Sequence, residues 1–130
     1  MFKKVCIIGC GLIGSSLARA IKKNNLSEKV VSSNRSDSIN KKVIELNTVD
    51  ESSSDTKKVV HNSDLVVIAA PLSSYEDIIL KIKDSLKKGA ILTDVGSVKE
   101  SILDIVDKNL PENISWIPSH PIAGTEESGP

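Results

Sequence analysis

Three glycines at a fixed spacing follow a short apolar run near the N-terminus. The run Val5–Ile8 leads directly into G-x-G-x-x-G. Where a parallel strand turns into a helix, the first glycine permits the tight turn, the second lets a phosphate approach the backbone, and the third lets the helix pack closely. The helix N-terminus then attracts phosphate through its free N–H groups and its dipole. The residues predicted to bind a dinucleotide here are Gly9, Gly11, Leu12, Ile13 and Gly14. The alternative is a glycine turn that only tightens packing.

Apolar runs alternate with helical patterns along the rest of the chain, which predicts an α/β fold of the Rossmann type: a doubly wound, mainly parallel sheet with helices on both faces. The predicted strands are Lys4–Ile8, Lys29–Ser33, Leu65–Ala70, Ala90–Thr93 and Ile114–Ile117. The segment from Asp50 to Lys58 is polar and serine-rich, and we expect a solvated loop or a short helix there.

The helices are predicted from apolar residues at helical spacing and from capping signals. The first helix has an apolar stripe of Leu12, Ile13, Leu17 and Ile21, and the second carries Ile39, Val43 and Leu46. The third has Ser73 and Ser74 as potential caps, the stripe Ile78, Ile82 and Leu86, and an end at Lys87–Gly89. The last runs from Val98 to about Asn109.

Length and charge bound the classes of function. The 130 residues suit one dinucleotide-binding domain, and the 17 basic residues balance the 17 acidic ones, so no overall field recruits nucleic acid or a membrane surface. Cys6 and Cys10 are too close for a disulfide framework, which favours a reducing cytoplasm. Lys3 and Lys4 before an apolar stretch imitate an export signal, but such a signal does not need glycines at this spacing. We expect no membrane span and no metal site.

The residue that follows the second strand bears on cofactor choice. NAD-binding domains of this kind place an acid about 20 residues beyond the glycines, where it binds the adenosine ribose. Here that residue is Asn34, followed by Arg35 and Ser36. A neutral amide does not repel a 2′-phosphate, and a guanidinium with a hydroxyl suits one, so we predict NADP in preference to NAD. Alternatively, Asn34 only caps the next helix and Arg35 is a solvated charge.

Ligands of open α/β sheets bind beyond the carboxyl ends of the strands. Besides the glycine loop, the segments expected there are Ala70-Pro71-Leu72 with the serines that follow, Asp94–Lys99 and His120–Thr125. His120 is the one histidine at such an end and could take a proton from a substrate hydroxyl, although a structural role is equally open. Ser97 could orient His120, or cap the next helix through S-x-x-E. His61 precedes a strand, and we expect it at the surface.

Four segments taken together resemble the prephenate/arogenate dehydrogenase family. They are GCGLIGSSLARAIK, DLVVIAAP, TDVGSVK and SHPIAGTEESGP, and the resemblance covers nearly the whole chain. The first two occur in many Rossmann enzymes, whereas the last two are specific to this family. The resemblance implies that His120 is the catalytic histidine, Ser97 its orienting partner, and Gly124 and Thr125 part of the wall near substrate and nicotinamide. Asn34 departs from the family pattern, which has an acid at this position.

The resemblance further implies oxidative decarboxylation of prephenate to 4-hydroxyphenylpyruvate, or of arogenate to tyrosine. Family members continue into a helical domain that makes a homodimer and adds substrate-binding residues, and we expect such a domain after Pro130; this piece alone would be inactive, and its own oligomeric state is open. Two alternatives remain: another NADP-dependent dehydrogenase of the β-hydroxyacid type, and a non-catalytic dinucleotide-sensing module.

Overall fold

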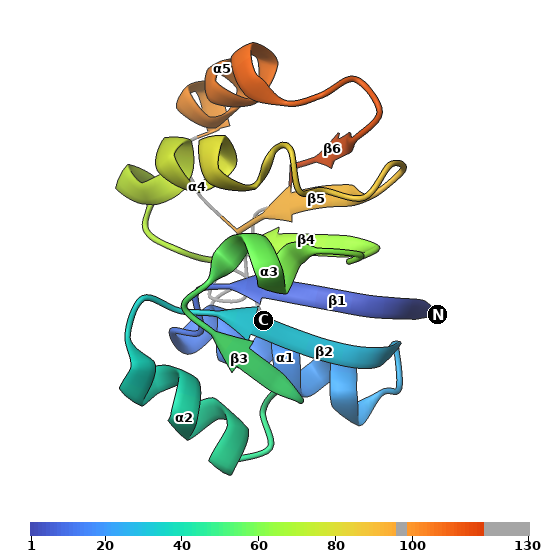
Figure 1. Cartoon of the computed structure of the whole chain (residues 1–130), viewed down its shortest axis with the longest axis vertical. Helices are drawn as coiled ribbons and strands as arrows, with labels where there is room; N and C mark the ends of the chain where they lie inside the picture. Colours follow the sequence, from blue (N-terminus) through green and yellow to red (C-terminus); the bar gives the residue numbers. More distant parts are fainter. Residues whose placement is uncertain (96–98, 119–130) are drawn as a thin grey trace, which may run out of the picture.

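The computed structural model describes residues 1–95 and 99–118. In this part of the chain, six parallel strands form one sheet in the order β3-β2-β1-β4-β5-β6 (Figure 1). The strands are β1 Phe2–Ile8, β2 Ser27–Ser33, β3 Glu51–Ser53, β4 Leu65–Ile68, β5 Ile91–Asp94 and β6 Ser115–Ile117. The predicted Rossmann-type parallel sheet is therefore confirmed, and the order reverses direction between β1 and β4, where such sheets bind their ligands.

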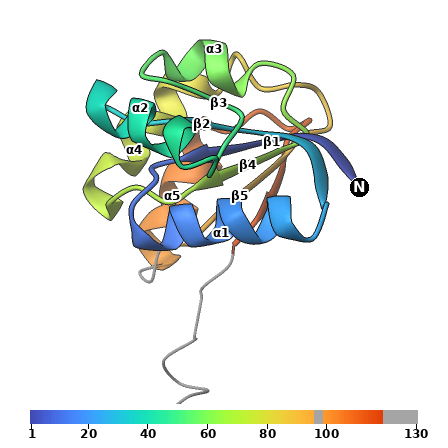
Figure 2. The same cartoon turned by 90° about the horizontal axis from the view of Figure 1, so that it is seen from below.

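Helices cover both faces of the sheet, as expected (Figure 2 shows α1 and α3 on opposite sides). They are α1 Leu12–Lys23, α2 Asp37–Glu45, α3 Thr56–Val60, the 3₁₀ turn η1 Leu72–Ser74, α4 Tyr75–Ile82 and α5 Lys99–Asn109. Successive residues of β1 point to opposite faces: Val5 and Ile7 pack with α1 and α2, while Cys6 and Ile8 pack with α3, α4 and α5. A strand buried on both faces reads as a continuous apolar run, which is why β1 and β4 are recognisable in the sequence.

The segment from Asp50 to Lys58 contains more structure than the loop or short helix that its composition predicts. It includes β3, which pairs with β2 through Val31↔Glu51 to Ser33↔Ser53, before the short helix α3. β3 is an edge strand of three residues whose side chains are exposed or half-buried, so it lacks the apolar alternation that marks a strand. The polar composition gives no periodic signal to detect.

The predicted helix faces and one helix end also need correction. In α1 the buried residues are Gly14, Ala18 and Ile21, whereas Leu12 and Ile13 are exposed. Asn40 and Val43 of α2 are buried, whereas Ile39 and Leu46, the residue that follows α2, are exposed. The helix faces the sheet with the side-chain amide of Asn40, which bonds to Asn34 after β2 and to Ser52 of β3. The helix α4 ends at Ile82 rather than near Gly89, and neither Ser73 nor Ser74 caps it through its side chain, because η1 runs directly into it.

Candidate functional site: the carboxyl edge of the sheet

The glycine loop has the geometry that a phosphate-binding turn requires. Gly9 has φ of 96°, a conformation that side chains disfavour, and a Cβ on Gly14 would overlap the carbonyl oxygen of Gly9. A Cβ on Gly11, in contrast, would meet no atom within 4 Å. The first and third glycines are thus required by packing, while the second leaves open space at the N-terminus of α1, where the first N–H groups have no carbonyl within the helix. The residues present fit a pyrophosphate bound to this turn.

Asn34 holds the glycine loop against the end of β2. It is buried, its Oδ1 accepts from the backbone N–H of Cys10 at 2.6 Å, and its Nδ2 donates to Oδ1 of Asn40 at 2.9 Å. Asn40 returns a bond from its Nδ2 to the carbonyl of Asn34 at 3.0 Å, and the Ser52 hydroxyl on β3 also donates to Asn40. Asn34 therefore has a structural role, because its amide both accepts from the loop and donates to Asn40, which an ionised acid could not do.

The suggestion that Asn34 caps the next helix is wrong, because Ser36 is the N-cap of α2. The Ser36 hydroxyl accepts from the backbone N–H of Ile39 at 3.4 Å. Arg35 is exposed, and its Nη2 donates to Oγ of Ser74 at 3.4 Å, so the guanidinium spans from the end of β2 to the start of α4. Of Asn34, Arg35 and Ser36, the residues predicted to contact the adenosine ribose and its 2′-phosphate, Arg35 is the one with an exposed charged group.

The ends of β4 and β5 are joined by a buried polar contact. Ala70, Pro71 and Leu72 follow β4 at the same edge as the glycine loop, and Pro71 and Leu72 are exposed. Tyr75 is fully buried, and its hydroxyl lies 3.2 Å from Oδ2 of Asp94 and 3.3 Å from the carbonyl oxygen of Ile68. The phenol donates to one or both of these acceptors and so ties the first turn of α4 to the carboxyl end of β5.

Ser97, His120, Gly124 and Thr125 lie outside the described residues, so their predicted roles stay predictions. His61 is exposed, as expected. Two residues that position the edge are not given a role by the sequence patterns: Asn40, which is hydrogen-bonded to Asn34, and Asp94 at the end of β5, which the sequence predicts at this edge only as the start of the segment Asp94–Lys99. Asn40 could have been found by its spacing, since it lies three residues before Val43 on the buried face of a predicted helix.

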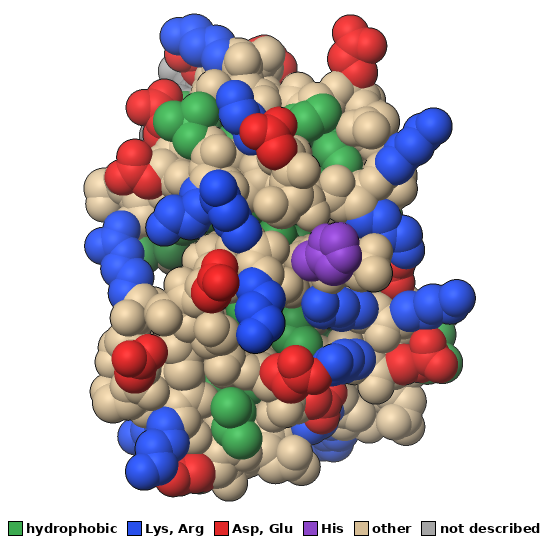
Figure 3. Space-filling view, in the orientation of Figure 1, with side chains coloured by type: hydrophobic (Ala, Val, Ile, Leu, Met, Phe, Trp, Pro, Cys, Tyr) green, Lys and Arg blue, Asp and Glu red, His purple; other side chains and the backbone are tan. Residues whose placement is uncertain are grey.

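Charges are mixed on the face that carries α3, where lysine, arginine and acidic side chains are interspersed (Figure 3). Within residues 1–95 and 99–118, no three histidine, cysteine or acidic side chains are placed to hold a metal ion. In the same part of the chain, no helix is both long and apolar enough to cross a membrane.

Both cysteines are unpaired, and burial raises the pKa of the Cys6 thiol to about 12.

Comparison with known proteins agrees with this geometry. Residues 17–130 match the family described as prephenate dehydrogenase, nucleotide-binding domain. The chain belongs to this family. It is 38% identical over 130 residues to cyclohexadienyl dehydrogenase of Zymomonas mobilis, and 30% identical over 126 residues to prephenate dehydrogenase of Bacillus subtilis. These alignments cover 100% and 96% of this chain.

Solved structures of family members have the same fold. The crystal structure of prephenate dehydrogenase from A. aeolicus in complex with hydroxyphenyl propionate and NAD+ matches with a TM-score of 0.85 at 24% identity, over 95% of this chain and 43% of that one. Synechocystis arogenate dehydrogenase matches with a TM-score of 0.81 at 27% identity, over 91% of this chain and 40% of that one. The chain also spans only 44% and 34% of the Zymomonas and Bacillus proteins, so it corresponds to their nucleotide-binding part.

Proposed function

We propose that this chain is the dinucleotide-binding part of an NADP-preferring enzyme that oxidatively decarboxylates prephenate or arogenate in tyrosine biosynthesis. The observation that carries the proposal is the family match over residues 17–130, joined to a glycine loop whose second glycine opens onto free space. Relatives named cyclohexadienyl, prephenate and arogenate dehydrogenase support the substrate class. The unpaired cysteines and the proposed biosynthetic role support a cytoplasmic location as part of this proposal.

The chemistry needs one hydride acceptor and one movable proton. The nicotinamide, when bound, would supply the acceptor for a hydride, the hydrogen and electron pair of the C–H bond on the ring carbon that bears the hydroxyl group. His120 accepts the hydroxyl proton as that carbon becomes a carbonyl, and Ser97 orients the imidazole. The bond to the ring carboxylate then breaks to release CO2, its electrons complete the aromatic ring, and the phenol oxygen regains a proton. Gly124 and Thr125 would line the space for substrate and nicotinamide.

Cofactor contacts are proposed along the edge between β2 and β4. The N–H groups of Leu12 and Ile13, with Gly9, Gly11 and Gly14 shaping the turn, would bind the pyrophosphate, and Ala70-Pro71-Leu72 would pass along the nicotinamide half. Because the amide of Asn34 is engaged with Cys10 and Asn40, recognition of the 2′-phosphate falls to Arg35 and the half-buried Ser36. NADP preference thus depends chiefly on one guanidinium.

In this proposal, substrate turnover requires a further domain in addition to this chain. The relatives extend over more than twice its length, and we propose a helical domain after residue 130 that forms the homodimer and adds substrate contacts. The 130-residue chain on its own should bind dinucleotide and turn over neither prephenate nor arogenate. Measurable turnover by the purified chain would contradict this division of roles.

Calorimetric titration with NADP and NAD tests the cofactor assignment. Arg35→Ala should weaken NADP by about 1.5–3 kcal/mol, the value of a hydrogen bond to a charged group, and leave NAD nearly unchanged. Lys23→Ala on the exposed end of α1 removes the same charge and should change neither affinity. Equal loss of NADP and NAD in Arg35→Ala, or equal affinities in the parent protein, would refute the assignment.

The chemical role of His120 is tested in the full-length enzyme. His120→Asn should lower kcat by about 10²- to 10⁴-fold, the range for a positioned acid–base group, without changing NADP affinity. Parent activity should fall on the acid side as the imidazole becomes protonated and no longer accepts a proton. A folded His120→Asn enzyme with the parent kcat on both substrates would remove this residue from the mechanism.

A further inference from the structure

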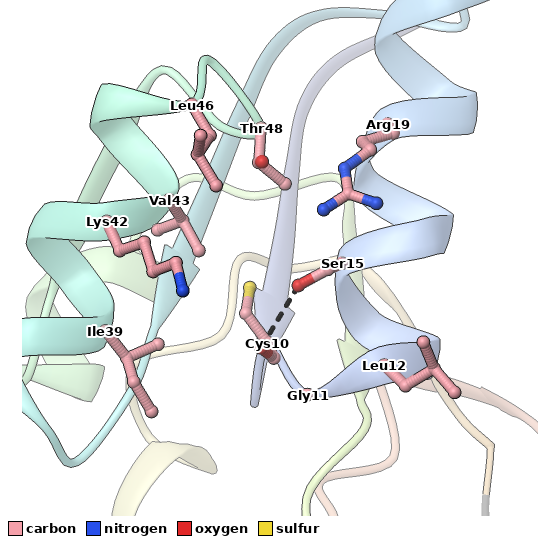
Figure 4. A pocket seen from close by; sticks show the side chains of 10 residues that line it. All are labelled: Cys10, Gly11, Leu12, Ser15, Arg19, Ile39, Lys42, Val43, Leu46 and Thr48. Carbon is pink, nitrogen blue, oxygen red and sulfur yellow. Dashed lines mark hydrogen bonds between the residues drawn. The ribbon is translucent and has the colours of Figure 1, made fainter.

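A groove of about 280 Å³ runs between α1 and α2, beside the glycine loop but along the helices rather than across the sheet edge (Figure 4). Its rim at the loop is formed by Cys10 and Gly11, and its other end reaches Thr48, which follows α2. Asn34, Arg35 and Ser36, the residues beside the proposed adenosine ribose, do not line it. The groove therefore meets the proposed pyrophosphate contacts only at Gly11 and Leu12 and extends from there away from the proposed ribose contacts, along the two helices.

Two cations face this groove without an acid to neutralise them. Arg19 on α1 and Lys42 on α2 point toward it from its two sides (Figure 4). Among the described residues neither makes an ion pair, whereas their helix neighbours do: Lys22 pairs with Asp50 at 2.9 Å and Lys41 with Glu45 at 4.0 Å. Arg19 and Lys42 thus bring two positive charges to the groove with no ion-pair partner among the described residues, which leaves a positive local field there; Lys23 also has no ion pair but does not line the groove.

The α2 wall of the groove is apolar. Ile39, Val43 and Leu46 line it, and Ile39 and Leu46 remain 41% and 60% exposed. The helical pattern predicts both as core residues, yet the fold leaves them open to solvent beside Lys42. Leu12, on the opposite helix, is exposed at the same groove. An apolar surface in a concave site next to cationic side chains is typical of a site for an organic anion.

A second observation concerns the hydroxyl group of Thr48, at the other end of the groove. It is 1% exposed, and its Oγ1 has no hydrogen-bond partner among the described residues. Buried hydroxyls are nearly always satisfied, because an unpaired one costs about 1–3 kcal/mol. The hydroxyl of Thr48, a residue that lines the groove, is thus left for a partner that the described residues do not supply.

We propose that the α1–α2 groove binds a small organic anion, a phosphate or carboxylate attached to an apolar body, separately from the dinucleotide. The anionic group lies between Arg19 and Lys42, and the apolar body covers Ile39 and Leu46. Guanidinium and ammonium groups both donate charge-assisted hydrogen bonds to such oxygens, and the pair suits either a phosphate or a carboxylate.

Phenyl phosphate is the probe for this site, with phenol as the matched ligand that lacks the anion. In ¹H–¹⁵N correlation spectra of the protein, phenyl phosphate should shift the amides of Ser15, Val43 and Thr48 in a saturable manner, and phenol should not. Arg19→Gln and Lys42→Gln should each weaken phenyl phosphate at least fivefold. Lys23→Gln and Lys41→Gln remove the same charge from the same two helices and should leave the affinity unchanged.

Three results would overturn the proposal: no saturable shift at these amides, equal weakening by the groove and control variants, or competitive displacement of phenyl phosphate by NADP. The last result would make the groove part of the cofactor site. Simultaneous binding of NADP and phenyl phosphate would support the proposal of a separate site. The outcome is independent of the proposed function, because failure of NADP to bind in the same samples would refute that function while leaving the phenyl phosphate result intact.

Discussion

Replacing Gly11 with alanine should separate dinucleotide binding from folding. Gly11 has φ of −77° and ψ of −155°, which alanine adopts without strain, and its added methyl group would meet no protein atom within 4 Å. The loss of unfolded-state freedom stabilises by about 0.4–1 kcal/mol, while alanine is a poorer N-cap than glycine, so the free energy of unfolding should change by less than about 1 kcal/mol. The methyl group would, however, project into the space where the pyrophosphate approaches the backbone.

The expected cost to binding is much larger. Moving the phosphates away from the first N–H groups of α1 removes at least one hydrogen bond to a charged group, worth about 1.5–3 kcal/mol, which corresponds to about a 10- to 150-fold rise in Kd for both NADP and NAD. Calorimetric titration measures this Kd, and urea unfolding followed by circular dichroism measures stability.

Gly14→Ala is the contrasting variant, because its methyl group would overlap the carbonyl oxygen of Gly9 and should destabilise the fold itself. If Gly11→Ala binds both cofactors with the parent Kd, the pyrophosphate does not lie on this turn and the reasoning fails. If Gly11→Ala unfolds as readily as Gly14→Ala, the assignment of separate roles to the two glycines is wrong.

Three further outcomes are expected. Asn34→Ala should lower the free energy of unfolding by about 1–3 kcal/mol in urea titrations, because it leaves the part-buried N–H of Cys10 without its acceptor and removes one of the two donors to Oδ1 of the buried Asn40; a change under about 0.5 kcal/mol would contradict this. The hydrogen bond from Lys87, followed by backbone N–H groups, lowers the pKa of Asp64, so its stabilisation exists above about pH 4 and is lost as pH falls through the lowered pKa. Asp64→Asn should therefore cost about 0.5–1 kcal/mol at pH 7 and progressively less as the pH falls, measured by urea unfolding at pH 7 and at pH 2. A thiol reagent at pH 8 should label Cys10 and not the buried Cys6 in the native protein, with NADP slowing the labelling; mass spectrometry identifies the site, and equal labelling of both would refute the burial of Cys6.

The sequence alone determined the elements with strong local signals. Apolar runs buried on both faces located β1 and β4, and the spacing of the glycines located the turn into α1, where we propose the phosphate site. These features depend on residues that are close together in the chain. Few residue types suit a strand that is buried on both faces, and few suit the positions where Gly9 and Gly14 approach each other. The resemblance carried by TDVGSVK and SHPIAGTEESGP indicated the family that the comparison then confirmed.

Tertiary structure decided everything that depends on partners distant in the sequence. β3 has no apolar pattern and exists because the edge of β2 offers it hydrogen bonds. Asn34 has the position of a ribose-reading residue, but its amide is bound to a loop 24 residues earlier and to Asn40 on the next helix. Leu12, Ile39 and Leu46 look like core residues by periodicity, yet they are exposed at the α1–α2 groove. Periodicity reports which side chains are apolar, whereas their burial depends on where the helices lie against the sheet, which is determined only when the whole chain packs.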